Sequence, residues 1–121
     1  MDLLMRQTVE TNALEIYALY CSIQDYFFLP IGSDSKITVA EALAIEPLRK
    51  LASRLHTRFL STFHKPTKYR FGFSFSPQEL LAIHVCIRNT KAEPLLQVIL
   101  GKVDQKALNL DNQVKLNNSG N

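Results

Sequence analysis

The sequence is poor in the residues from which common active sites are built. Its 121 residues include four glycines, two cysteines and no tryptophan. The glycines are scattered at Gly32, Gly72, Gly101 and Gly120, so they form neither a phosphate-binding loop nor a dinucleotide-binding fingerprint. No HExxH, GxSxG or CxxC pattern is present. We therefore expect a protein that is not an enzyme and that holds no cofactor and no metal ion.

The titratable residues do not form a catalytic set either. Paired carboxylates are absent from the apolar segments, which removes the usual acid–base couple. His56 and His64 are eight residues apart, a spacing that offsets them on a helix. His84 follows Ile83 and precedes Val85, and this apolar setting predicts a neutral histidine in the core.

Long hydrophobic runs are also missing. The most apolar stretch of the first segment spans about eight residues, whereas a membrane-spanning helix needs roughly 20. Asp2 stands where a signal peptide carries basic residues. Cys21 and Cys86 each lie within an apolar run, which is typical of reduced core thiols. We expect a cytoplasmic protein that does not associate with membranes.

What the chain does have is apolar residues at three- and four-residue steps, the spacing of helices with one buried face. The chain length points to one domain over residues 1–108, and the Asn-rich remainder, 109–121, is expected to be a disordered polar tail. The predicted helices are Leu3–Tyr26, Val39–Ile45, Pro47–Phe63, Pro77–Ile87 and Pro94–Leu108.

Local sequence fixes several of these helix ends. Ser76 is a good N-cap, Pro77 suits the first helical position, and Glu79 completes a capping box. Pro47 is expected to break or kink the helical segment around it, because proline lacks the backbone N–H and crowds the preceding turn.

One segment has a period of two instead. Residues Tyr69–Phe75 alternate aromatic with small or polar side chains, which predicts a half-buried strand. A lone strand is unstable, so it is expected to pair with Lys36–Val39 or with its own copy in a dimer. The predicted fold class is mainly α: a small bundle of four to five helices with one short extended aromatic segment at about 69–75.

The charges are unevenly distributed along the chain. Residues 1–46 carry seven acidic and two basic side chains, whereas 47–78 carry seven basic and no acidic ones. Three alternatives could balance the basic stretch: acids of the first helix such as Glu10 and Glu15, an acidic protein partner, or a polyanion. The candidate polyanion-binding residues are Lys50, Arg54, Arg58, Lys65, Lys68 and Arg70.

Two predicted helices, centred on Tyr20 and Ile83, are apolar on nearly every side. Such helices must be covered on every side, so we expect the chain to form a homodimer. Aromatic residues are enriched in interface cores, and the candidate self-association residues are Tyr17, Tyr20, Phe27 and Phe28. The expected function is a non-enzymatic helical protein–protein interaction module; the alternative is an accessory nucleic-acid-binding protein that uses the basic residues.

Overall fold

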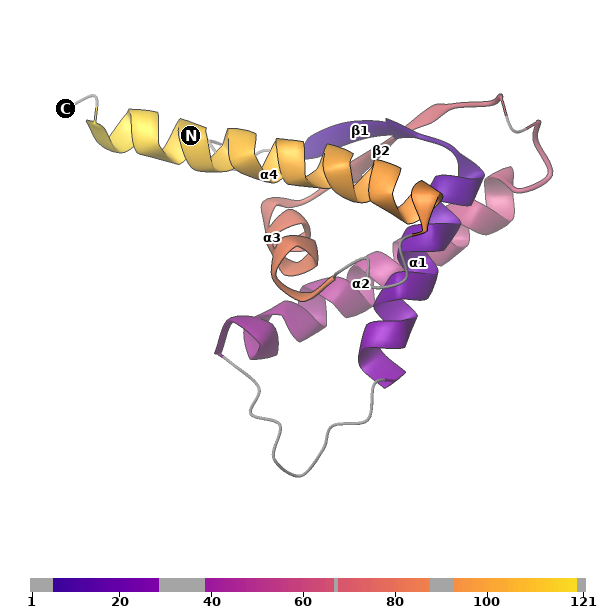
Figure 1. Cartoon of the computed structure of the whole chain (residues 1–121), viewed down its shortest axis with the longest axis horizontal. Coiled ribbons are helices and arrows are strands. Elements are labelled where there is room, and N and C mark those ends of the chain that lie inside the picture. The colour runs from indigo at the N-terminus through magenta and orange to yellow at the C-terminus, as the bar shows by residue number, and fades with distance from the viewer. Residues whose placement is uncertain (1–5, 29–38, 67, 88–92, 120–121) are drawn as a thin grey trace.

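The computed structural model describes the backbone of residues 6–28, 39–66, 68–87 and 93–119, and the side chains of the same residues as far as Leu108 with the exception of Phe28. Within these ranges the protein is mainly helical with one two-stranded sheet, as predicted (Figure 1). Helix α3 lies between α2 and α4, and α4 runs beside the sheet (Figure 1). The elements in chain order are β1 Gln7–Thr11, α1 Ala13–Phe28, α2 Val39–Thr62, β2 Phe71–Phe75, α3 Pro77–Cys86 and α4 Pro94–Ser119.

The first element corrects the prediction of a helix over Leu3–Tyr26. Residues 7–11 form strand β1, and α1 begins only at Ala13. Val9 and Thr11 point into the core while Thr8 and Glu10 are exposed, which is the alternation of a strand. The β-branched side chains of this stretch favour the extended form once a neighbouring strand is present.

Strand β2 occupies most of the predicted extended segment, but its neighbour in the sheet was not predicted. It pairs antiparallel with β1, and Val9 lies opposite Phe73. Of the expected partner Lys36–Val39, residues 36–38 lie outside the described part of the chain, and Val39 begins helix α2. A Cβ at Gly72 would lie 2.8 Å from Thr8 Cγ2, so the close approach of the two strands favours glycine there.

Helix α2 is continuous where two helices were predicted. Pro47 lies inside it, and no break separates Val39–Ile45 from the residues that follow. Packing explains the continuity, because Ala44 and Leu48 are buried on either side of the proline. The carbonyl that loses its donor belongs to Leu43, whose side chain is 73% exposed, so water can reach that turn.

Helix α3 begins as predicted. The Ser76 side chain accepts the backbone N–H of Glu79 at 3.1 Å, and the Glu79 carboxylate accepts the N–H of Ser76 at 2.7 Å. Helix α4 differs at its end: its backbone stays helical to Ser119, where a disordered tail was predicted from residue 109. The division of the chain into domain and tail at 108 stays a prediction.

The core is formed by one face of each helix and the inner face of the sheet. Phe75 on β2, Ile16 on α1, Leu55 on α2 and Ile83 on α3 have no exposed surface, and α4 adds Ile99. The segments around Tyr20 and Ile83 that were expected to be apolar all round are buried on only part of their circumference. The exposed remainder is where binding surfaces have to be sought.

Candidate functional site

Arg54 forms the tightest polar contact of the predicted basic residues. Its Nη1 donates to both carboxylate oxygens of Glu79 at 2.8 Å, and its Nη2 donates to the Ser74 carbonyl at 2.6 Å. Arg6 approaches the same carboxylate at 3.7 Å. Glu79 is buried, and this shell of donors offsets the cost of burying its charge.

Arg58, one turn along α2, also faces the sheet. Its Nη1 donates to the Gly72 carbonyl at 3.4 Å, and its guanidinium carbon lies 5.3 Å from the centre of the Phe71 ring. Arg54 stacks in the same way on Phe73, at 4.8 Å. The two arginines therefore hold α2 against the outer edge of β2.

Arg70 pairs with the acids that the sequence analysis named as one alternative. Its Nε donates to Glu10 Oε1 at 3.0 Å, and its Nη2 lies 3.7 Å from Glu15 Oε2. Lys65 lies over the ring of Tyr69 at 4.6 Å. Lys50 and Lys68 are exposed. The structure thus brings four of the six predicted residues, Arg54, Arg58, Lys65 and Arg70, into contacts within the chain, and polyanion binding by the set stays a prediction.

Glu15 is a second buried carboxylate, whose role the sequence analysis missed. It accepts the Thr11 hydroxyl at 2.9 Å, and Lys102 Nζ on α4 lies 3.2 Å away. The Asn12 side chain accepts the backbone N–H of Glu15 at 2.9 Å, which makes Asn12 the N-cap of α1. The spacing of Asn12 and Glu15 is a signal for a helix start at this point. Apolar residues continue at helical spacing on both sides of Asn12, however, and this spacing predicts a helix without interruption.

A group of exposed apolar and aromatic side chains, the aromatic surface, lies across α1 and α2. The ring centres of Tyr17 and Phe59 are 4.6 Å apart, those of Tyr20 and His56 are 5.2 Å apart, and those of Phe59 and Phe63 are 5.6 Å apart. Tyr17 and Phe63 are 44% and 58% exposed. With the leucines one turn before them, the aromatic surface consists of Leu14, Tyr17, Tyr20, His56, Phe59, Leu60 and Phe63.

The aromatic surface contains two of the four predicted self-association residues. A hydrogen bond with the Cys21 thiol raises the pKa of Tyr17 above its usual value, so this phenol stays neutral at neutral pH. Phe27 and Phe28 lie at the far end of α1, where Phe27 packs against the core. The side chain of Phe28 lies outside the described part of the structure, and no contact given for Phe27 joins it to the aromatic surface.

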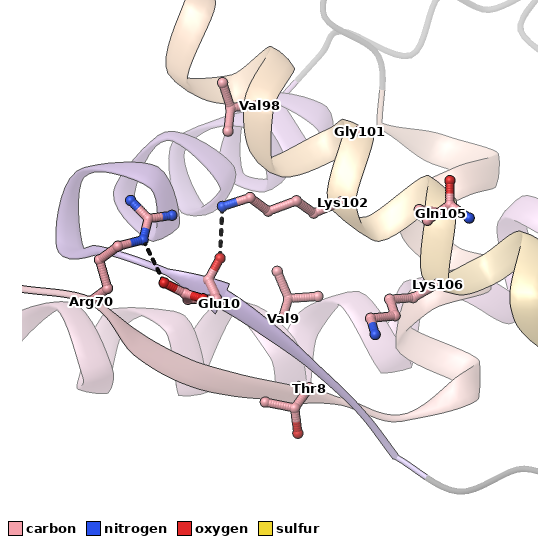
Figure 2. A pocket seen from close by; sticks show the side chains of 9 residues that line it. All are labelled: Thr8, Val9, Glu10, Arg70, Val98, Gly101, Lys102, Gln105 and Lys106. Atoms are coloured by element: carbon pink, nitrogen blue, oxygen red, sulfur yellow. Dashed lines mark hydrogen bonds and ion pairs between the residues drawn. The ribbon is translucent and has the colours of Figure 1, made fainter.

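A groove of about 750 Å³ separates β1 from α4 (Figure 2). Lys102 and Lys106 extend from α4 toward the strand, and Arg70 approaches Glu10 from the opposite side (Figure 2). Three basic side chains and one acidic side chain thus border the groove. Its lining residues are Thr8, Val9, Glu10, Arg70, Val98, Gly101, Lys102, Gln105 and Lys106.

The prediction that His84 lies in the core is wrong. His84 is exposed on α3, and its Nδ1 lies 3.1 Å from Asp104 Oδ1 on α4, so it links two helices at the surface. The helix turns Ile83 inward and His84 outward, which the apolar neighbours in sequence did not reveal. Within the described ranges no cluster of three or more His, Cys, Asp or Glu side chains could hold a metal ion.

Comparison with protein-family models, with curated proteins and with solved structures found no match to this chain. None of the helices in the described part of the chain combines the length and apolar character needed to cross a bilayer.

Proposed function

We propose that this chain is a non-enzymatic protein–protein interaction module that self-associates through the aromatic surface. The observation that carries the proposal is the exposure of neighbouring rings and leucines on one face of two packed helices. Isolated exposed apolar residues are ordinary, but contiguous groups of them are typical of interaction sites. Tyrosine and phenylalanine are enriched in the cores of such sites.

A second copy of the chain is the partner that suits this surface. The aromatic surface contains no Asp, Glu, Lys or Arg, so two copies can meet face to face without charge repulsion. A two-fold dimer brings the same patch of both subunits together, which requires a surface that is compatible with itself. A cytoplasmic location is part of the proposal, and the burial of the Cys86 thiol in the core supports it.

The experiment compares two leucines that differ in place but not in exposure. Leu60 in the aromatic surface is 52% exposed, and Leu81 on α3 is 53% exposed. Light scattering at micromolar concentration should give twice the 13.8 kDa chain mass for the wild type and for Leu81→Glu, but the single-chain mass for Leu60→Glu. A wild type that scatters as one chain, or a Leu60→Glu dimer, would refute the proposal.

Nucleic-acid binding is the second candidate, because all three lysines of the predicted set are exposed residues. The candidate now depends on Lys50, Lys65 and Lys68, since Arg54, Arg58 and Arg70 contact the protein itself. A titration with mixed-sequence DNA and RNA at two salt concentrations tests it. Binding that weakens steeply with salt, and that is lost when all three lysines become glutamate, would support it.

A further inference from the structure

Within the described part of the chain, one edge of strand β1 has no neighbouring strand. On β2, the carbonyls of Gly72 and Ser74 accept arginine side chains from α2, so they point away from β1. In an antiparallel pair, the backbone groups of two opposite residues point either toward each other or away from each other. Thr8 lies opposite Ser74 and Glu10 lies opposite Gly72, so the backbone groups of Thr8 and Glu10 point away from β2, toward the groove. Lys102 Nζ donates to the Glu10 carbonyl from that side, at 2.7 Å. Such an edge is a template for an added strand.

The opposite wall of the groove contains a glycine that the fold does not require. Gly101 lies inside α4, and a Cβ placed on it would meet no atom within 4 Å. Glycine in a helix interior destabilises the helix relative to alanine. Because a Cβ at this position would touch nothing, the glycine brings no packing benefit in return. What its missing side chain does provide is open space in the wall that faces β1 (Figure 2).

The charges around the groove favour an acidic occupant. Arg70, Lys102 and Lys106 outnumber Glu10, which among the residues that the structure describes is the one acidic side chain lining the groove. Arg70 and Lys102 already contact Glu10 and Glu15, whereas Lys106 forms no ion pair with any residue that the structure describes. A carboxylate near Lys106 would supply the missing negative charge.

We infer that the groove between β1 and α4 binds an extended acidic peptide, which pairs with the free edge of β1 as a third strand. Backbone bonds to Thr8 and Glu10 hold the peptide in register, and every second side chain faces the α4 wall. On that wall, Val98, which is 47% exposed, offers the peptide an apolar contact, and Lys106 binds a carboxylate of the peptide. The site is separate from the aromatic surface and does not depend on self-association.

The first test uses the backbone of the probe. A fluorescent eight-residue peptide, Val-Thr-Glu-Thr-Val-Thr-Glu-Thr, carries its Val and Glu side chains on one face and is made in three forms: unmodified, methylated on every threonine nitrogen, and methylated on every valine and glutamate nitrogen. In strand pairing only alternate N–H groups face the protein, so one methylated form should bind at least about tenfold more weakly and the other should bind as the unmodified peptide does. Equal binding of both methylated forms would overturn the inference, as would no binding of the unmodified peptide.

The second test fills the groove from the side of α4. Gly101→Trp places a ring in the open space and should weaken binding of the unmodified probe by at least about tenfold. Leu95→Trp is the control, at an exposed position of the same helix that does not line the groove, and it should leave binding unchanged. Circular dichroism and the thermal midpoint establish that both variants are folded. Equal effects of the two tryptophans would refute the site.

The measurements are repeated in the Leu60→Glu background, so that failure of the dimer and failure of the groove give different results. Peptide binding that persists in this background supports the groove whether or not the chain dimerises. The groove could instead hold a second copy through β1. In that case the probe would not bind, and Gly101→Trp would lower the mass measured by light scattering, which would overturn the inference of a peptide site.

Discussion

Two strand-to-helix units of this protein have the same local design, but different basic side chains bind the buried glutamate of each. In each unit a strand passes through one capping residue, Asn12 after β1 and Ser76 after β2, into a helix. The third residue of each helix is a glutamate, Glu15 or Glu79, that is at most 5% exposed. Each carboxylate then receives two basic side chains from elsewhere in the chain.

The basic side chains that bind the two glutamates differ in stiffness. Arg54 places one planar group on both oxygens of Glu79 at 2.8 Å, whereas Lys102 reaches Glu15 at 3.2 Å through a flexible stem and Arg70 stays at 3.7 Å. The comparison teaches that the same local cap can be fixed rigidly or loosely by its distant partner. The loosely fixed unit, β1–α1, is also the one that borders the groove.

The largest expected effect comes from removing each buried charge in turn. Glu79→Gln leaves Arg54 without its counter-ion and should lower the free energy of unfolding by about 3 kcal/mol. Glu15→Gln should cost less, about 1 to 2 kcal/mol, because its ion pairs, at 3.2 and 3.7 Å, are longer than the 2.8 Å contact of Arg54 with Glu79. Glu46→Gln, in an exposed pair with Arg49, is the control and should change stability by less than about 0.5 kcal/mol. Urea unfolding measures all three, and equal losses for the two buried glutamates would contradict the comparison.

A smaller effect is expected when the shape of the base is changed but its charge is kept. Arg54→Lys loses the planar group that bonds the Glu79 carboxylate through Nη1 and the Ser74 carbonyl through Nη2, and should cost about 1 to 2 kcal/mol. Arg70→Lys is matched in exposure, 39% against 36%, and should cost no more than about 0.5 kcal/mol. The same urea experiment decides the point, and the ranking is wrong if Arg70→Lys is the more damaging change.

The smallest difference is expected between the two caps. Ser76→Ala and Asn12→Ala each remove one acceptor for a helical N–H and should each cost about 1 kcal/mol. Thermal unfolding of the two variants side by side would test this equivalence. If the caps prove equal while the glutamates differ, the distant bases are the source of the difference between the units.

The sequence was most informative where the structure is local. The cap at Ser76 and the helix after it depend on four consecutive residues, and they were predicted correctly. The apolar positions of α2 were also predicted from spacing, since Leu48, Leu51 and Leu55 are all buried. Phe63, the predicted last residue of this helix, is 58% exposed, because the helix ends at Thr62 and none of the described elements covers it.

Long-range contacts decided the features that were missed. Val9, Ala13 and Ile16 continue a helical spacing without interruption, and only pairing with β2 makes residues 7–11 extended. The excess of bases after Pro47 indicated that acids were needed, and Glu10 and Glu15 were one of three alternatives, but nothing in the spacing indicated that Glu79 would bind Arg54. The partners of a charge are set by the tertiary fold, and one-dimensional spacing carries no information about them.

The register that sets Val9 opposite Phe73 also imposes an order of events at the ribosome. Strand β1 is made before α1 and α2, but its neighbour in the sheet is complete only when residue 75 has emerged. During that interval α1 and α2 can form and pack by themselves, while β1 remains without a sheet partner. The closing of a loop that contains two whole helices is then the entropically costly step, and folding of the nascent chain should be completed late.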